Sequence, residues 1–169
     1  MNDLKWTEAR MQDCLTCWKS LFYFRRYACV PNVSYGLLDH GEADLLCLSN
    51  SGVFHEVEIK VTKSDLLADA KKRRAHEHRL VPYCWFAVPT DLVGLALDCV
   101  DSRFGIVECW LKPDKQADGL LPIYATRVIR KPKRYKQASE KKPTQEEILQ
   151  FLRLGVMRMW GRRHPEAME

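Results

Sequence analysis

The sequence predicts a single-domain α/β layer fold, and three observations support this. The chain has 169 residues, of which 46% are hydrophobic, so it can bury one sizeable core. Helical and strand-like segments follow one another in the order helix, three strands, helix, two strands, helix, which is typical of a mixed α/β layer fold. No internal repeat interrupts this order.

The first half of the chain supplies a helix and three strands. A helix from Asp3 to about Phe22 is predicted because apolar residues recur at helical spacing, namely Leu4, Met11, Leu15, Trp18 and Phe22. Glu8 falls on the same face. Strand patterns follow in the stretches VSYGLLD, ADLLCLS and VFHEVEIKV.

The second half of the chain supplies a helix, two strands and a last helix. A helix from about Ser64 to His78 is capped by Thr62 or Ser64. The stretch YCWFAVP is nearly all apolar and predicts a strand buried on both faces, and FGIVECW predicts another. Thr144 and Glu147 have the spacing of a capping box at the start of a last helix. Its expected apolar stripe consists of Ile148, Leu149, Leu152, Val156, Met159 and Trp160.

The turn Asn50-Ser51-Gly52 fixes the register of the central hairpin. A three-residue loop that ends in glycine predicts that Ser49 pairs with Val53. Counting back places Asp44 opposite Glu58, and Glu42 opposite Lys60. The other face of this hairpin is aliphatic and should pack on the core; it carries Ala43, Leu45, Val57 and Ile59.

The pairing of Asp44 with Glu58 needs a physical reason. Two like charges on directly opposed residues, about 4.5 to 5.5 Å apart, destabilise a sheet, unless one is protonated or a cation lies between them. Mg²⁺ binds one or two carboxylates together with water and phosphate oxygens. Asp44, Glu58 and the backbone carbonyl of Ile59 would therefore suffice as ligands, with Glu8 as a further candidate.

Lys60 points to the same face as Glu58 because the two residues are two apart in a strand. Its ammonium could orient a metal-bound water or neutralise charge on a scissile phosphate. Acting as a base would require its pKa to fall from about 10.4 to about 7, and the neighbouring acids Glu42 and Glu58 oppose that fall. We therefore expect a charged Lys60 and a metal that acidifies the water. A solvated hairpin face with alternating charges is the alternative interpretation.

Charge and cysteine content narrow the class of protein. The net charge is +5, and residues 127–142 contain eight Lys or Arg against one Glu, which favours a polyanionic partner or a solvated linker. Seven cysteines, an odd number, argue against a disulfide framework. Cys14-x-x-Cys17 with Cys29 leaves a zinc or iron-sulfur site as an alternative.

With no apolar run long enough for a membrane span and no secretory signal pattern, we expect a cytoplasmic protein.

Asp44, then Glu58-Ile59-Lys60, on successive strands after a helix bearing Glu8, resembles the PD-(D/E)xK nuclease superfamily. More narrowly, EADLLCL, EVEIKVTKSDLLADAKK and WFAVP are similar to the MmcB-like DNA-repair group and its phage-type relatives. In that group an E-I-K strand leads into a helix and then a strand ending F-A-V-P. Here the helix supplies Asp65, Leu66, Ala68, Asp69 and Lys71, and the final RLGVMRMW also looks like the phage-type relatives.

The resemblance implies a restriction-endonuclease-like fold, a mixed central β-sheet flanked by helices. It also implies Mg²⁺ or Mn²⁺ at Asp44 and Glu58, Lys60 as the catalytic lysine, and DNA as a more fitting substrate than RNA, in repair, recombination or phage DNA metabolism. Some members of the superfamily only bind, so a catalytically inactive nucleic-acid-binding accessory protein is the alternative. The expected division is a nuclease-like domain over 1–126, a basic linker over 127–143, and a helix and tail over 144–169.

Cations around the predicted site are expected to hold the phosphates that flank the scissile one. These are Lys63, Lys71, Lys72, Arg73, Arg74, Lys131, Lys133 and Arg134. A solvated helix face is the alternative for those after Lys60. His76 and His78 would diverge on a helix, which argues against a zinc pair. A protein partner or a homodimer is left open by the sequence.

Overall fold

The computed structural model describes residues 5–34, 37–39, 41–69, 78–112, 123–136, 138 and 142–163. Their helices are α1 (Glu8–Thr16), α2 (Lys63–Asp69), the 3-10 turn η1 (Thr90–Leu92), α3 (Val93–Cys99) and α4 (Gln145–Arg163). The strands are β1 (Tyr27–Ser34), β2 (Glu42–Ser49), β3 (Phe54–Ile59), β4 (Tyr83–Pro89), β5 (Gly105–Lys112) and β6 (Ile123–Arg130).

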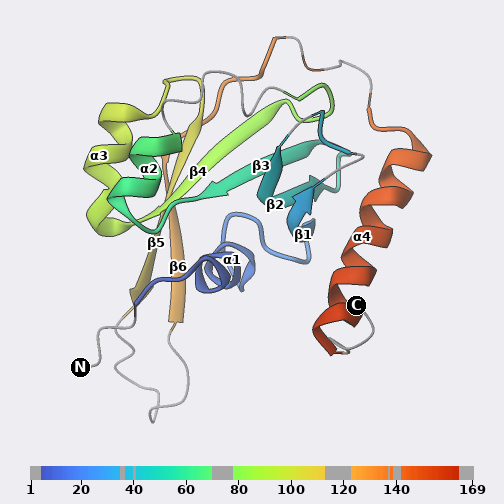
Figure 1. Ribbon diagram of the computed structural model, residues 1–169, viewed down its shortest axis with the longest axis horizontal. Helices are drawn as coiled ribbons and strands as arrows, with labels where there is room; N and C mark the ends of the chain where they lie inside the picture. Colours follow the sequence, from blue (N-terminus) through green and yellow to red (C-terminus); the bar gives the residue numbers. More distant parts are fainter. Residues whose placement is uncertain are drawn as a thin grey trace.

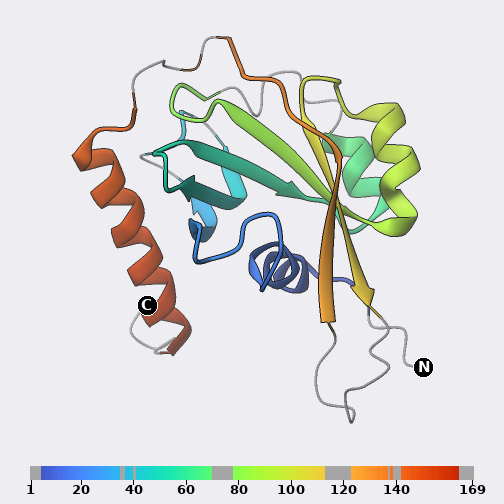
Figure 2. The same cartoon turned by 180° about the vertical axis from the view of Figure 1, so that it is seen from behind.

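The six strands form one mixed sheet in the order β1-β2-β3-β4-β5-β6. The pairs β1–β2, β2–β3 and β5–β6 are antiparallel, whereas β3–β4 and β4–β5 are parallel. Helix α1 lies on one face, α2 and α3 lie together on the other, and α4 runs past β1 (Figures 1 and 2). The expected α/β fold with a mixed sheet and flanking helices is thereby confirmed.

Both faces of the sheet are packed. On the α1 face, Met11 and Leu15 meet Leu45 and Val57. On the other face, α2 and α3 pack against β4 and β5 through Leu66, Phe86, Ala96 and Ile106. Strand β4 is buried along nearly its whole length, as predicted for a strand that is covered on both sides.

The first helix is shorter than predicted. It begins at Glu8, where Thr7 caps the amide of Arg10, and it ends at Thr16 because the backbone of Cys17 is extended. The apolar spacing continues past that end without a helix. Trp18 is 62% exposed, and Phe22 is fully buried from the following loop.

The first strand also lies earlier than predicted. The expected stretch was 33–39, whereas β1 covers Tyr27–Ser34 and pairs with β2 from Tyr27–Ser49 to Ser34–Glu42. Pairing with β2 places the strand N-terminal to most of the aliphatic stretch 33–39 from which it was predicted. Leu37 and Leu38 are buried outside the strand.

Three elements were not predicted, the short turn η1, α3 and β6. Helix α3 has only seven residues, too few for a clear periodic pattern. Strand β6 pairs with β5 and ends at Arg130, so the predicted linker over 127–143 begins inside the sheet. Arg127 and Arg130 belong to this strand, and their charges concealed it in the sequence.

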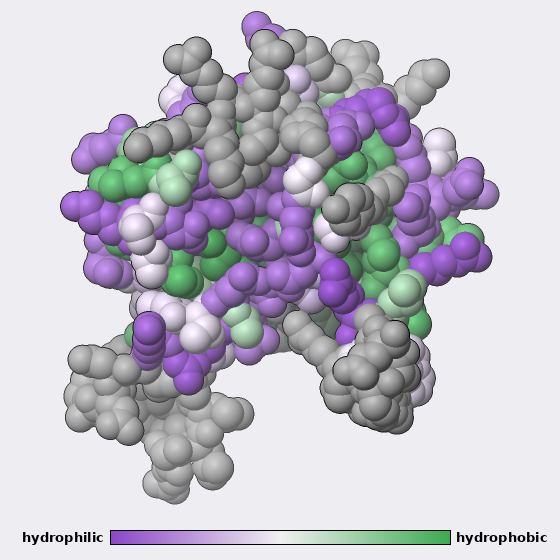
Figure 3. Space-filling model, viewed as in Figure 1, coloured by the Kyte–Doolittle hydropathy of each residue, from purple (hydrophilic) through white to green (hydrophobic). Residues whose placement is uncertain are grey.

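Helix α4 begins as predicted, but its buried face differs. Thr144 and Glu147 form the capping box: the Thr144 amide donates to Glu147 Oε2 at 2.7 Å, and the Glu147 amide donates to Thr144 Oγ1 at 3.2 Å. Phe151 is fully buried against Phe54. Of the predicted stripe, Ile148 packs against the core. The rest of the stripe is exposed over α4, at the right of Figure 3; it consists of Leu149, Leu152, Val156, Met159 and Trp160. None of the helices within the described ranges has the length and apolar content that a bilayer crossing requires.

Candidate active site

The hairpin register is the predicted one. The Ser49 amide donates to the Val53 carbonyl at 2.9 Å, and Gly52 adopts a φ of 79°. The bridged pairs run from Leu48–Phe54 to Leu45–Val57. Beyond them the ladder opens, and the Asp44 carboxylate accepts a hydrogen bond from the Ile59 amide at 2.7 Å. Asp44 therefore meets the end of β3 through its side chain rather than as a regular cross-strand partner of Glu58.

Lys60 lies at the centre of a carboxylate cluster. Its Nζ is 2.9 Å from Glu58 Oε2, 3.7 Å from Asp44 Oδ2 and 3.9 Å from Asp69 Oδ2. The structure thus brings the three predicted catalytic side chains together. Asp69 completes the group; it was part of the motif on which the resemblance rested, but no role was predicted for it.

The charged face of the hairpin is more buried than a solvated strand face would be. The side chains of Lys60, Glu58 and Asp69 are 8%, 6% and 2% exposed, and that of Asp44 is 21% exposed. Leu46 and Phe54 are buried as well, so the hairpin packs on both faces. Asp44 is consequently the member of the cluster most open to solvent.

Burial and charge act on Lys60 in opposite directions. Burial lowers the pKa of its ammonium, but the carboxylates, led by Glu58, outweigh burial and hold the pKa above its usual value. Lys60 is therefore a cation at neutral pH. This agrees with the expectation that it is not the base.

Burial raises the pKa of the Asp44 carboxyl above its usual value. The hydrogen bond from Ile59 and the ammonium of Lys60 oppose this rise, whereas Glu8 and Asp65 add to it. A negative charge on Asp44 is therefore costly in the bare protein. A nearby cation would relieve that cost.

Glu8 reaches the same region through an amide network. Its Oε1 accepts from Asn32 Nδ2 at 2.6 Å and from Gln12 Nε2 at 3.1 Å. Gln12 Nε2 also contacts the Asp44 carbonyl oxygen at 2.8 Å. Asn32 has a φ of 51° within β1, a conformation that asparagine tolerates better than most residues. Neither Gln12 nor Asn32 was predicted; the sequence signal for Gln12 is its position one turn after Glu8, on the same face of the helix.

The donor set suits a hard divalent cation. Three carboxylates face one ammonium, which leaves two formal negative charges when all are ionised, and oxygen is the ligand that Mg²⁺ prefers. Within the described ranges, no three His, Cys, Asp or Glu side chains are already arranged around a vacant metal position. The ammonium of Lys60 lies between the carboxylates, so ion binding would require Lys60 to shift. The carbonyl of Ile59 as a ligand stays a prediction.

Other titratable side chains lie elsewhere on the sheet. His78 Nε2 is 3.6 Å from Glu56 Oε2, and both side chains are 1% exposed. His76 lies outside the described residues. Cys14 Sγ donates to the Ala125 carbonyl, whereas Cys29 Sγ donates to the Phe22 carbonyl. These two thiols of the alternative metal site therefore contact different parts of the backbone.

The predicted phosphate-binding cations are only partly described. Lys63, Lys131, Lys133 and Arg134 are exposed to solvent. Lys71, Lys72, Arg73 and Arg74 lie outside the described residues. Lys63 opens α2, three residues after Lys60, so it stands close to the cluster along the chain.

Comparisons with known proteins add one solved structure. No family model matches the chain, and neither does any curated protein. The chain is similar to the "SPO1766 protein of unknown function from Silicibacter pomeroyi", with 17% identity and a TM-score of 0.55 over 84% of this chain and 83% of that one. Similarity at this level of identity shows a shared fold.

Proposed function

We propose that this protein is a nuclease dependent on Mg²⁺ or Mn²⁺ that hydrolyses phosphodiester bonds of DNA, in the restriction-endonuclease-like fold of the PD-(D/E)xK superfamily. The observation that carries the proposal is the meeting of Asp44, Glu58 and Lys60 where β2 and β3 diverge. An ammonium flanked by buried carboxylates at a sheet end is suited to bind a cation and a phosphate side by side.

The order of the elements supports the proposed fold. Helix α1 carries Glu8, and the antiparallel strands β2 and β3 carry the acids. Helix α2 then contributes Asp69, and the parallel strand β4 ends in Phe86 to Pro89. This is the sequence of parts that the resemblance implies.

Each side chain has a distinct role in the proposed reaction. Asp44 and Glu58 would hold the ion, which would supply an acidified water and offset charge on the phosphate. Lys60, a cation in the folded protein, stabilises the negative charge that develops on the scissile group. Gln12 fixes the backbone of Asp44 through its carbonyl, and exposed cations such as Lys63 hold flanking phosphates.

A second function is favoured by the contact between Lys60 and Glu58. At 2.9 Å, with both side chains nearly buried, this ion pair neutralises one of the two acids that would bind the ion. A protein in which the pair stays closed would bind nucleic acid without cutting it. That describes a catalytically inactive accessory protein of the same fold.

Cleavage of DNA separates the two functions. Purified protein is incubated with supercoiled, linear and single-stranded DNA in Mg²⁺, in Mn²⁺ and in EDTA, beside Lys60→Ala and the matched control Lys63→Ala. The nuclease proposal predicts metal-dependent cleavage that falls by about 10² to 10³ in Lys60→Ala and by much less in Lys63→Ala, which removes only a contact to a flanking phosphate. Cleavage that persists in Lys60→Ala would refute the site, and binding without cleavage by the wild type would favour the accessory protein.

A further inference from the structure

The loop over residues 17–26, between α1 and β1, presents an aromatic platform formed by Trp18, Tyr23 and Phe24. Trp18 and Phe24 are 62% and 63% exposed. Tyr23 connects them: its ring centroid lies 5.1 Å from that of Trp18 and 4.8 Å from that of Phe24, both edge to face. Large rings so exposed in one small loop mark an interaction surface.

The aromatic platform is held rigidly against the body of the protein. Phe22, in the middle of the loop, is fully buried. The Ser20 hydroxyl donates to the Cys14 carbonyl, and the Leu21 amide donates to Thr126 Oγ1 at 3.1 Å. A platform that is already ordered loses little conformational entropy when a partner binds.

A small pocket lies between the platform and the β5–β6 pair. Its volume is about 310 Å³, and three aromatic side chains, Trp18, Trp110 and Tyr124, contribute to its walls. Lys19 also lines it. Trp110 pairs with Ala125, next to Tyr124, so the pocket borders the edge strand β6. Its size and aromatic lining suit one flat ring system.

The charged side chains of the loop itself are all positive. Lys19, Arg25 and Arg26 are exposed, and the sequence contains no acid between Asp13 and Asp39. Arg127 places its guanidinium 5.9 Å from the centre of the Trp110 ring, but its charge is paired with Glu108 at 2.7 Å. Aromatic rings for stacking, interleaved with cations for phosphates, are the features with which proteins bind single-stranded nucleic acid.

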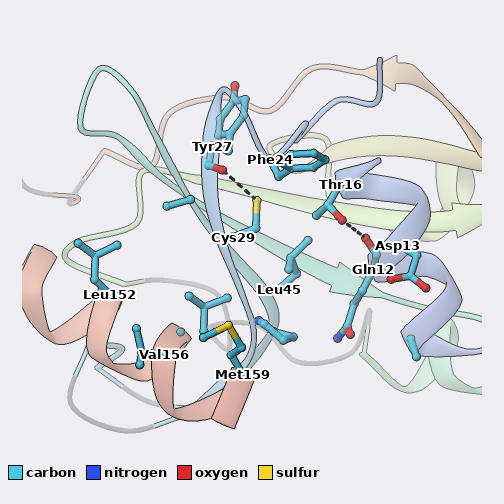
Figure 4. A pocket seen from close by; sticks show the side chains of 15 residues that line it. Gln12, Asp13, Thr16, Phe24, Tyr27, Cys29, Leu45, Leu152, Val156 and Met159 are labelled. Atoms are coloured by element: carbon cyan, nitrogen blue, oxygen red, sulfur yellow. Dashed lines mark hydrogen bonds between the residues drawn. The ribbon is translucent and has the colours of Figure 1, made fainter. Parts of the chain in front are cut away.

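A groove runs from the platform to Gln12 of α1. It has a volume of about 720 Å³, lies between α1, β1 and α4, and is lined by Phe24 and Tyr27 as well as by Gln12 (Figure 4). Gln12 is the residue that contacts the Asp44 carbonyl. A strand bound across the platform could therefore continue along the groove as far as Gln12, which borders the backbone of Asp44.

We propose that the platform and its pocket bind single-stranded nucleic acid, with one base stacked on Trp18 inside the pocket and the adjacent phosphates held by Lys19, Arg25 and Arg26. This deepens the proposed function, on which it rests for the strand being a substrate. Binding itself does not require cleavage. Single-stranded DNA and RNA share this chemistry, and the experiment distinguishes them.

The test measures fluorescence anisotropy of labelled 15-nucleotide oligothymidylate, oligouridylate and a duplex of the same length, with the full chain in EDTA. Trp18→Ala should weaken single-strand binding roughly tenfold, the loss expected from one stacked base. Trp160→Ala is the matched control, because this tryptophan of α4 is also about half exposed. Lys19→Ala should reduce the slope of log affinity against log salt by about one contact. Thermal melts establish that each variant is folded.

Four outcomes would overturn the proposal: no single-strand binding by the wild type, tighter binding of the duplex, equal losses in Trp18→Ala and Trp160→Ala, or a Trp18-dependent dimer in sedimentation without binding of oligonucleotide. Binding in EDTA that depends on Trp18, without cleavage in Mg²⁺, would uphold this inference and refute the nuclease. Cleavage that depends on Lys60, with oligonucleotide binding that does not depend on Trp18, would uphold the nuclease and refute this inference.

Discussion

Lys60 holds together a group of acids that would otherwise repel one another. Removing its ammonium leaves Asp44, Glu58 and Asp69 without the cation that faces all three. Lys60→Met should lower the free energy of unfolding by about 3 to 5 kcal/mol at pH 8, as for other broken buried ion pairs. The loss should shrink as the pH falls and the carboxyls take up protons. Urea denaturation at several pH values measures both effects.

Lys63→Met is the control for this substitution. Lys63 is an exposed lysine three residues further along the chain, so its loss should change stability by no more than about 0.5 kcal/mol. If Lys60→Met were as stable as Lys63→Met at pH 8, the carboxylate cluster would not depend on the ammonium.

The negative charge of Asp44 should lower the stability of the protein when no ion is bound. A carboxyl whose pKa is raised by folding stabilises the fold below its usual pKa, and that contribution is lost as the pH rises through the folded value. Asp44→Asn in EDTA should therefore have a Tm at pH 8 at least equal to that of the wild type, with the gain vanishing in acid. Differential scanning calorimetry measures it.

The control for Asp44 is Glu42→Gln, on the same strand but exposed, which should leave the Tm unchanged at both pH values. A clear drop in the Tm of Asp44→Asn at pH 8 would show that the charge of Asp44 stabilises the bare protein. The cost assigned to that charge would then be wrong.

At the scale of elements, alanine substitutions at two glycines should change the stability in opposite directions. A Cβ on Gly105, the first residue of β5, would lie 2.4 Å from Cε3 of Trp85 and 2.9 Å from Cδ of Pro132. Gly105→Ala should destabilise the protein by about 1 to 3 kcal/mol. A Cβ on Gly94 in α3 meets no atom within 4 Å, so Gly94→Ala should stabilise by up to about 1 kcal/mol.

Urea denaturation of the two alanine variants measures this difference. Equal effects of Gly105→Ala and Gly94→Ala would show that β5 does not pack tightly against Trp85. The pair also tests the close contact between β4 and β5, which sets the spacing of the parallel part of the sheet.

Turn and capping rules, which depend only on neighbouring residues, predicted the central hairpin and the start of α4 correctly. Asn50-Ser51-Gly52 fixed the hairpin register, and with it the meeting of Asp44 and Lys60, because a short turn allows few pairings. The same is true of the capping box at Thr144. Tertiary contacts decided the rest. Trp18 continues the helical spacing of α1, but the backbone turns at Cys17, and the charges of β6 concealed a strand that β5 completes.

In the candidate site, too, the residues close in sequence were predictable and those brought together by packing were not. Glu58 and Lys60 are two residues apart in sequence, so their common direction was predictable. Asp69 and Gln12 enter the site from α2 and α1, and only the packing of those helices on the sheet brings them there. Which face of α4 is buried was likewise set by Phe54 and Val30, which Phe151 and Gly155 contact.

At the scale of the whole molecule, His55 should make the fold sensitive to acid. Its ring stacks on Tyr83 and accepts a hydrogen bond from Trp85 Nε1 at 3.3 Å. Burial lowers the pKa of His55 to about 4. A depressed pKa gives stability that is present above the unfolded value, near 6.5, and lost as the pH falls to about 4. This loss amounts to about 3 kcal/mol.

The free energy of unfolding, followed by urea denaturation between pH 7 and pH 4, measures this contribution. His55→Phe keeps a ring in the aromatic cluster but cannot be protonated, so its stability should fall less steeply over that interval. Identical slopes for the wild type and His55→Phe would assign the acid sensitivity to other groups.

Direct measurement of ion binding tests the central claim that Asp44 and Glu58 hold a divalent cation beside Lys60. Mn²⁺ is titrated into the wild type, Asp44→Asn, Glu58→Gln and the control Glu42→Gln, and binding is followed by electron paramagnetic resonance. The account predicts binding by the wild type and by Glu42→Gln, and a loss of at least tenfold in affinity for each of the other two variants. Binding that is equal in all four proteins, or absent from the wild type, would contradict it.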